Sequence, residues 1–149
     1  MTDIIIVGAG TAGLSAAIYA LRAGKSVLVF EQLTYGGQII NTPEVDNYPG
    51  IRSISGFDFA TGLYEQATSL GAVIESAQVE AIEDGAVKKV IAGGAAYECK
   101  VVILATGAKN RPLGLEREEE LTGAGVSYCA TCDGAFYKNR AVALCQPLL

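Results

Sequence analysis

The feature that most constrains this fold is the glycine-rich turn GAGTAG at residues 8–13, which separates an apolar segment from an alanine-rich one. The preceding segment, DIIIV at residues 3–7, is short, apolar and β-branched, as is typical of a buried parallel strand. Residues 13–23 are rich in alanine and leucine and are followed by Gly24, which predicts a helix that ends at a glycine. A second apolar strand is expected at residues 26–30. Strand, glycine turn, helix and strand in this order make a βαβ unit.

The same turn has the pattern GxGxxG, which between a strand and a helix indicates a dinucleotide-binding site. Gly8 permits the tight turn, Gly10 lets a pyrophosphate approach the backbone, and Gly13 lets the helix and the strand pack closely. The helix N-terminus offers unpaired amide hydrogens to the phosphates. Glu31 follows the second strand, where an acidic side chain can bind ribose hydroxyls. The spacing does not separate FAD from NAD, and a glycine-rich turn without a ligand is the alternative.

Local signals predict a second helix and a set of further strands. The sequence SGFD at residues 55–58 resembles a capping box and predicts a helix that runs to about residue 70. Strand-like stretches follow at residues 72–75, 79–82, 87–92 and 95–104. Gly93-Gly94 stands between the last two of these stretches and is a hairpin signal.

Three expectations concern the second half of the chain. Cys99 alternates with charged neighbours in its strand, which predicts a buried thiol in an apolar role. Residues 116–120 contain four acids and one arginine and are expected to form a solvated face. Residues 141–144 are apolar and are expected to begin another strand.

A second group of glycine and amide residues lies in the segment 32–54, which has no clean periodicity. The adjacent Gly36 and Gly37 allow a flat ligand close to the backbone, and Gln38 and Asn47 carry amides that donate or accept hydrogen bonds. A segment of this length without its own structure is usually functional or disordered. A ligand-binding loop and an ordinary polar loop are equally compatible with this local chemistry.

The stretch CATCDG at residues 129–134 carries a third kind of chemistry. A CxxC pair lowers the pKa of a cysteine and holds a resolving partner nearby, so Cys129 and Cys132 are candidates for disulfide exchange. Asp133 could exchange a proton with the leaving sulfur, and the chain has no histidine for that role or for Ser-His-Asp and Cys-His catalysis. A zinc site would need the other two cysteines as ligands, and an inert pair is a further alternative. We expect redox chemistry and no metal.

Charge and hydropathy indicate which classes of partner and which cellular compartment to expect. The net charge is −5 and no long basic run occurs, which argues against nucleic acid as the main ligand. No apolar run approaches the roughly 20 residues that a membrane-crossing helix needs. No signal peptide is recognisable, so we expect a cytoplasmic protein without a membrane segment. Half of the residues are apolar, which suggests surface that a partner covers.

Four stretches together resemble the low-molecular-weight thioredoxin reductases. They are VGAGTAGLSAAIYALRAG from residue 7, EQLTYGGQIINTPEVDNYPG from residue 31, ILATGAKNRPLGL from residue 103 and SYCATCDGAFYKNR from residue 127. The resemblance runs from Thr2 to about Leu144, and CATCDG placed after ATG narrows it to this family. It implies an α/β fold: a Rossmann-like FAD-binding domain at residues 1–112, with a parallel sheet and a β-hairpin meander. The start of a second, NADPH-binding domain with the CxxC pair would follow at residues 113–149.

The resemblance also implies a role for each group of candidate residues. The FAD pyrophosphate would be held by Gly8, Gly10, Thr11, Ala12 and Gly13. Gly37, Gln38 and Asn47 would lie along the flavin half, and Thr106 and Gly107 would close the pocket. Glu31 would bind the adenosine ribose, and Cys132 would exchange electrons with the flavin ring. Cys129 would engage the disulfide of a thioredoxin-like protein, with Asp133 as proton donor or acceptor.

The sequence departs from the family pattern at its end, where CQPLL stands in place of the second glycine-rich fingerprint, which binds NADPH. We therefore expect a truncated, amino-terminal portion of such a reductase, with no direct reduction by NADPH and with weakened FAD binding. Its exposed apolar surface would be covered in a homodimer or by a missing complementary segment. The alternatives are a non-catalytic nucleotide-binding or interaction fragment, or part of a peroxidase-serving flavoprotein reductase.

Overall fold

The computed structural model describes residues 1–145, apart from the side chains of Thr131 and Cys132. Contacts divide the chain into an amino-terminal unit, Met1–Gly107, and a carboxy-terminal unit, Ala108–Leu149. Each unit is described by itself below. The assignment of residues 1–112 and 113–149 to two domains stays a prediction.

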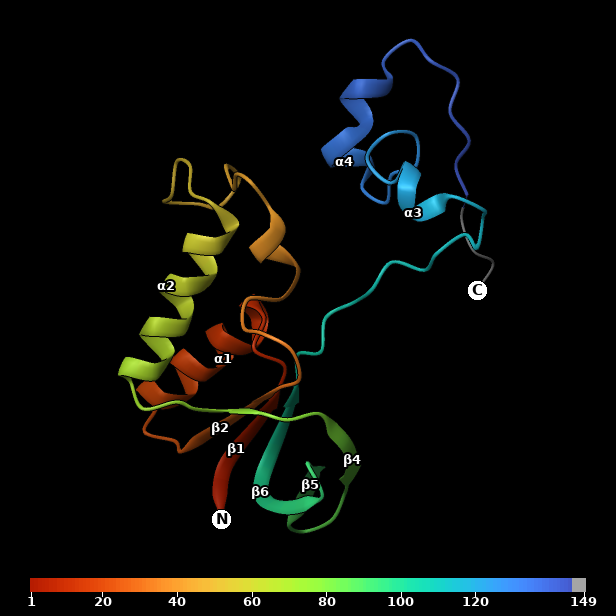
Figure 1. Ribbon diagram of the computed structural model, residues 1–149. Helices are drawn as coiled ribbons and strands as arrows, with labels where there is room; N and C mark the ends of the chain where they lie inside the picture. Colours follow the sequence, from red (N-terminus) through yellow and green to blue (C-terminus); the bar gives the residue numbers. More distant parts are fainter. Residues whose placement is uncertain (146–149) are drawn as a thin grey trace. The chain divides into compact units, whose positions relative to one another are not determined.

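The amino-terminal unit is an α/β structure built on one mixed sheet (Figure 1). Its six strands lie in the order β3-β2-β1-β6-β5-β4. The first four strands of this order run parallel, and β6, β5 and β4 are joined antiparallel. Their bounds are β1 Thr2–Val7, β2 Val27–Glu31, β3 Val73–Ser76, β4 Val79–Glu83, β5 Lys88–Ala92 and β6 Ala95–Leu104. The predicted parallel sheet and meander are confirmed.

Two helices follow the glycine turn and the long loop, and they connect the parallel strands. Helix α1 spans Thr11–Arg22 and joins β1 to β2, which completes the predicted βαβ unit. Helix α2 spans Gly56–Ser69 and precedes β3. The Ser55 hydroxyl accepts a hydrogen bond from the Asp58 N–H at 3.0 Å and donates one to an Asp58 carboxylate oxygen at 2.6 Å, so Ser55 is the N-cap at the predicted start of this helix.

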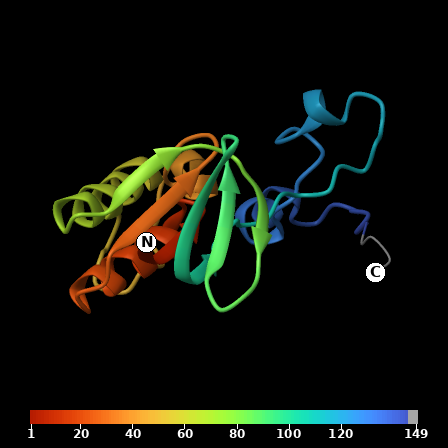
Figure 2. The same ribbon diagram turned by 90° about the horizontal axis from the view of Figure 1, so that it is seen from below.

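Alternation along the parallel strands creates two apolar cores. One face of the sheet packs against α1 and α2 and contributes, with those helices, Ile6, Val29, Leu14, Ala17, Ile18 and Ala67. The other face packs against the meander, in a core of Ile5, Leu28, Phe30, Val90, Ala92 and Cys99. Figure 2 shows the green and teal strands of the meander beside the red and orange parallel strands. Each large apolar side chain that is fully buried contributes about 1.5–3 kcal/mol to folding.

The meander confirms two further predictions. Gly93 and Gly94 have φ values of 56° and 75°, the left-handed conformation that a tight hairpin turn between β5 and β6 requires. Cys99 has 0% of its surface exposed, and burial raises the pKa of its thiol. It is a free, structural cysteine.

The carboxy-terminal unit consists of short elements. They are α3 Glu118–Leu121, α4 Ala130–Asp133 and the 3₁₀ turn η2 Gly134–Tyr137. The strand expected at residues 141–144 does not form, and that prediction is wrong. A strand needs a neighbouring strand to pair with its backbone N–H and C=O groups. The β-structure within residues 108–145 is limited to an isolated bridge between Thr122 and Val126, so no partner strand is present there.

The acidic segment 116–120 also differs from expectation. Arg117, Glu119 and Glu120 are exposed as predicted, but Glu118 has only 8% of its surface exposed. Backbone N–H groups surround its carboxylate and make this burial possible, as described below. Within residues 1–145, the helices are too short or too polar to cross a membrane.

Candidate functional site

The glycine turn between β1 and α1 has no room for side chains at two of its positions. Gly8 has φ 105°, and a Cβ there would lie 2.3 Å from the Ala105 carbonyl oxygen. A Cβ on Gly13 would lie 1.9 Å from the Gly8 carbonyl oxygen. Both positions therefore require glycine, because the turn, the helix and the segment after β6 approach each other at backbone distance.

The N-terminus of α1 is open at the second glycine of the turn, Gly10. Gly10 is the N-cap and provides no side-chain hydrogen bond to the first turn of the helix, which begins at Thr11. A Cβ on Gly10 would meet no atom closer than the Gly36 carbonyl oxygen at 4.0 Å. The exposed Ala12 and the half-buried Thr11 lie in the same first turn. A helix start of this kind offers N–H groups and positive dipole to an anion, as a pyrophosphate requires.

Glu31 links the end of β2 to the glycine turn. One carboxylate oxygen accepts a hydrogen bond from the Ala9 N–H at 2.8 Å, and the other accepts one from the Leu33 N–H at 3.0 Å. The Gly8 N–H donates to the Phe30 carbonyl oxygen at 2.8 Å. Glu31 thus lies at the carboxyl edge of the sheet, where ligands bind in open α/β folds.

A small cavity of about 130 Å³ opens at this edge. Its lining includes Gly8, Glu31 and Thr106 from the predicted set. It also includes residues that sequence reasoning missed: Val7, Phe30, Gln32, Ala77, Gln78 and Val79. For Val7, Phe30 and Gln32 the available signal was their position at the ends of β1 and β2. Ala77, Gln78 and Val79 lie between the end of β3 and the start of β4 and had no local signal. A cavity for a whole small-molecule ligand has about 300 Å³ or more, so this one fits part of a larger ligand.

The loop after β2 brings its glycines to the turn. The Gly36 N–H donates to the Ala9 carbonyl oxygen at 2.8 Å, and Gly36 and Gly10 form an isolated parallel bridge. Gly37 begins the 3₁₀ turn η1, Gly37–Asn41, and a Cβ on it would lie 3.5 Å from the Gly10 Cα. Gln38 is exposed in the same turn. This arrangement brings the first two predicted groups together.

Other candidates lie farther along the loops. Asn47 is exposed in a loop closed by hydrogen bonds between the backbones of Val45 and Ile54, at 2.7 and 3.2 Å. Thr106 and Gly107 are exposed after β6, and Gly107 has φ 69°. Of these three, the structure places only Thr106 in the lining of the cavity at Glu31.

In the carboxy-terminal unit, Cys129 is disulfide-bonded. Its N–H donates to the Ser127 hydroxyl at 3.1 Å, and that hydroxyl donates to an Asp133 carboxylate oxygen at 2.7 Å. The Asp133 N–H donates to the Cys129 carbonyl oxygen at 3.0 Å. Asp133 is therefore linked to Cys129 directly through its backbone N–H and indirectly through its side chain, by way of the Ser127 hydroxyl. The side chain of Cys132 lies outside the described part of the structure, and its role stays a prediction.

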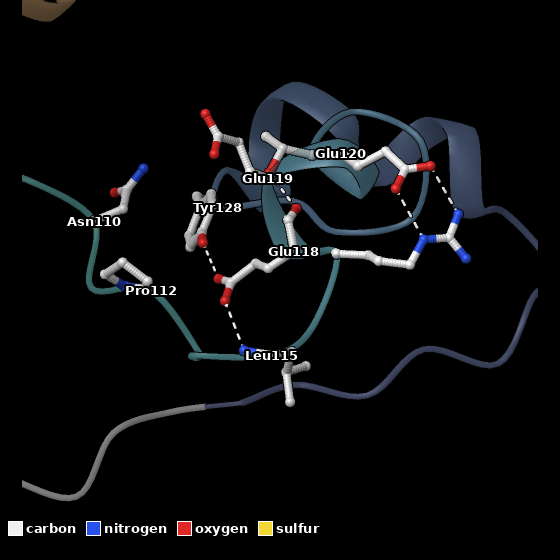
Figure 3. A pocket seen from close by; sticks show the side chains of 9 residues that line it. Asn110, Pro112, Leu115, Glu118, Glu119, Glu120 and Tyr128 are labelled. Atoms are coloured by element: carbon white, nitrogen blue, oxygen red, sulfur yellow. Dashed lines mark hydrogen bonds and ion pairs between the residues drawn. The ribbon is translucent and has the colours of Figure 1, made fainter.

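The segment before the cysteines is anchored by the buried Glu118 (Figure 3). Its carboxylate accepts hydrogen bonds from the Tyr128 hydroxyl and from the N–H groups of Leu113, Gly114 and Leu115, the backbone bonds being 2.7–3.1 Å long. The Tyr128 hydrogen bond and the backbone bonds together lower the pKa of Glu118 to about 2. The same contact raises the pKa of Tyr128.

A wide hollow of about 930 Å³ lies around Glu118 and Tyr128. Its remaining lining residues are Asn110, Pro112, Leu115, Arg117, Glu119, Glu120 and Thr122. Arg117 is paired with Glu120 at 2.7 Å, and the Glu118 carboxylate is held by Tyr128 and backbone N–H groups. Glu119 is exposed. Among the described residues, no three His, Cys, Asp or Glu side chains are arranged to hold a metal ion.

Comparison with known proteins relates most of the chain to one group of enzymes. Residues 2–145 match the family model described as pyridine nucleotide-disulphide oxidoreductase. A thioredoxin reductase of Listeria monocytogenes is 48% identical over 139 residues, which cover 93% of this chain and 44% of that protein. The crystal structure of a thioredoxin reductase from Streptococcus pyogenes matches with a TM-score of 0.81 and 47% identity, over 92% of this chain and 45% of that one.

A second solved structure is also similar to this chain. A ferredoxin-flavin thioredoxin reductase from Clostridium acetobutylicum matches with a TM-score of 0.68 and 34% identity, over 91% of this chain and 47% of that one. The chain thus spans less than half the length of these relatives.

Proposed function

Because this chain belongs to the pyridine nucleotide-disulphide oxidoreductase family, we propose that it carries the FAD site and the redox-active disulfide of a thioredoxin reductase. The observation that carries the proposal is the disulfide at Cys129, held next to a carboxylate, in a chain whose other unit has a glycine turn shaped for a dinucleotide. Thioredoxin reductases of Listeria and Streptococcus share this chain's sequence at 47–48% identity.

The residues of the glycine turn fit FAD. Gly8 and Gly13 have no space for a Cβ, while Gly10 has open space in front of an uncapped helix N-terminus. We assign the pyrophosphate to Gly8, Gly10, Gly13 and the N–H groups of Thr11 and Ala12. We assign the adenosine ribose to the cavity at Glu31, and Thr106, which the resemblance places where the pocket closes, lines the same cavity.

The flavin half is assigned to Gly37, Gln38, Asn47 and Gly107. Support comes from the approach of Gly37 to Gly10, which places this loop at the turn. FAD, when bound, supplies the two-electron chemistry that reduces a disulfide. The protein residues bind it, orient it and carry the sulfur pair.

At the sulfur pair, Cys129 and Cys132 take up two electrons and two protons and become two thiols. They are then oxidised back to a disulfide when they reduce the disulfide of a thioredoxin-like protein to two thiols, so that electrons and protons balance. In our proposal Cys129 attacks the protein disulfide, Cys132 exchanges electrons with the flavin, and Asp133 gives or takes the proton.

We assign no nicotinamide site to residues 1–149, because the sequence holds a single GxGxxG fingerprint. NADPH is thus proposed as the reductant of the complete enzyme and not as a ligand of these residues. Reversible thiol–disulfide exchange occurs in reducing compartments, so we propose that the protein is cytoplasmic. Side chains such as Leu33 and Leu104 are exposed, and we propose that a homodimer or a complementary segment covers them.

The test is an anaerobic titration of the purified chain with FAD and a chemical reductant. We expect flavin absorption to co-purify with the protein or to saturate on titration, and dithionite to bleach it. Thiol counting before and after reduction should show two additional thiols in the wild-type chain. Cys129→Ser should keep the flavin and lose this increment. A chain that binds no FAD and releases no thiols on reduction contradicts the proposal and favours a non-catalytic module.

A further inference from the structure

The Ser127 hydroxyl lies between the backbone of Cys129 and the side chain of Asp133. It accepts a hydrogen bond from the Cys129 N–H at 3.1 Å and donates one to an Asp133 carboxylate oxygen at 2.7 Å. The Asp133 N–H closes the loop by donating to the Cys129 carbonyl oxygen at 3.0 Å. These three bonds connect residues 127, 129 and 133 across the CxxC stretch.

The direction of the hydroxyl proton decides what Ser127 does here. A serine hydroxyl has one proton to donate. Its two possible acceptors are the Asp133 carboxylate at 2.7 Å and the Cys129 carbonyl oxygen at 3.3 Å. The shorter bond to a charged acceptor is the stronger one. The orientation of the Asp133 carboxylate thus depends on the Ser127 hydroxyl.

We propose that Ser127 is a positioning residue for disulfide exchange, which fixes the Asp133 carboxyl group beside Cys129 so that it can exchange a proton with a sulfur of the pair. This inference rests on the proposed redox function. It assigns to Ser127 a role that acts through Asp133, and Ser127 itself touches no sulfur in it.

The step that Asp133 serves can be written with a dithiol as reductant. A thiolate of the dithiol attacks one sulfur, the S–S bond of the pair breaks, and a mixed disulfide and one cysteine thiolate form. The second thiol of the dithiol then displaces the remaining cysteine as a thiolate. The dithiol leaves as a cyclic disulfide, and its two electrons and two protons remain on the pair as two thiols. A positioned carboxyl group aids the transfer of a proton to each departing thiolate.

Four substitutions separate the effect of the Ser127 hydroxyl from those of the Asp133 carboxylate and of side-chain packing. Ser127→Ala removes the hydroxyl, and Asp133→Asn removes the group through which it acts. Ser127→Thr keeps a hydroxyl, while Ser127→Val has nearly the same shape without one, so this second pair isolates the hydroxyl from packing. All variants are made with Cys145→Ser, which removes the exposed free thiol, and Cys99 is buried.

The measured quantity is the rate at which dithiothreitol reduces the disulfide, in H₂O and in D₂O at matched pL. General acid–base catalysis contributes about 10²–10⁴-fold, and we expect Ser127→Ala to lose roughly tenfold of it. The ratio of the rates in H₂O and D₂O should also differ between Ser127→Ala and the wild-type chain. Ser127→Thr should retain the wild-type rate and isotope effect, and Ser127→Val should resemble Ser127→Ala. In the Asp133→Asn background, Ser127→Ala should have no further effect.

Three outcomes overturn the inference. Ser127→Ala or Ser127→Val with an unchanged rate and isotope effect shows that the hydroxyl does not act in exchange. Independent, multiplicative losses from Ser127→Ala and Asp133→Asn show that it does not act through Asp133. A Ser127→Thr variant as slow as Ser127→Val, with wild-type circular dichroism, shows that packing explains the loss. A wild-type disulfide that no dithiol reduces contradicts the proposed function itself, whereas a loss in Asp133→Asn alone contradicts only the role of Ser127.

Discussion

The carboxylate of Glu118 accepts a hydrogen bond from the hydroxyl of Tyr128, the residue immediately before Cys129. The same carboxylate collects the N–H groups of Leu113, Gly114 and Leu115. It therefore connects the loop that follows residue 112 to the segment that carries the cysteines.

This contact predicts acid sensitivity of the carboxy-terminal unit. The pKa of Glu118 is about 2 in the folded chain against an ordinary value of 4.5, so its contribution to stability is present above about pH 4.5. That contribution is lost as the pH falls toward 2. Amide hydrogen exchange, corrected for intrinsic rates, should show protection of the peptide spanning residues 113–115 at pH 6 that disappears toward pH 2.

Two variants control this prediction. Glu118→Gln should remove the acid dependence in that peptide and lower its protection at pH 6. Tyr128→Phe should keep the backbone contacts and shift the loss of protection to higher pH, because the largest cause of the lowered pKa is gone. Local exchange is needed as the readout, because Glu120, Asp3 and Asp84 also have lowered pKa values. The same acid dependence in Glu118→Gln contradicts the assignment.

The glycine turn gives a prediction with a matched control. Gly13→Ala places a Cβ 1.9 Å from the Gly8 carbonyl oxygen, so the helix or the strand must shift. Such overpacking costs about 1–3 kcal/mol, which urea unfolding measures. Gly62→Ala introduces the same methyl group in α2, where no atom beyond the neighbouring residues and the helix's own backbone lies within 4 Å, and should stabilise the chain by about 0.5–1 kcal/mol. Equal effects at the two positions are incompatible with a close approach at Gly13.

The βαβ unit could be predicted from sequence because its signals are local. The β-branched run before Gly8, the alanine-rich helix and Gly93-Gly94 each determine the conformation of a few neighbouring residues. Ser55 and Asp58 likewise lie within one helical turn. Both faces of β1 and β2 are apolar, as is typical of central strands in a parallel sheet, but this pattern does not determine the order in which the strands pair.

The parts that could not be predicted depend on contacts between distant segments. Glu118 looks like one acid among four in EREEE, and only the approach of residues 113–115 and Tyr128 makes its burial favourable. Gln78 and Val79 line the cavity at Glu31 because β3 ends beside β2, which no local pattern indicates. The apolar run at residues 141–144 suggested a strand, but strand formation depends on a partner strand.

Cys99 and Cys145, which are both free in the described part of the chain, should differ in reactivity. The thiolate is the nucleophile, and burial raises the pKa of the Cys99 thiol, whereas Cys145 is exposed. Native-state alkylation followed by peptide mass spectrometry should label Cys145 promptly and Cys99 only on unfolding. Cys99→Ser should destabilise the chain by about 1–3 kcal/mol, because a hydroxyl replaces a thiol in an apolar core. Similar labelling rates for the two thiols contradict this packing.

Glu31 should stabilise the turn and also contribute to nucleotide affinity. Its two oxygens serve separate N–H groups, those of Ala9 and Leu33. Glu31→Ala leaves both donors without this acceptor, which costs about 1–3 kcal/mol in urea unfolding of the ligand-free chain. Glu31→Gln keeps one acceptor oxygen, so its loss of stability should lie between those of the wild-type chain and Glu31→Ala.

Glu31→Ala should also weaken FAD binding by roughly tenfold, the equivalent of about 1.4 kcal/mol. Quenching of flavin fluorescence measures this affinity. Gln32→Ala alters the same cavity without touching the turn and should change FAD affinity alone. Unchanged stability of the ligand-free Glu31→Ala chain contradicts the role of Glu31 in holding the turn.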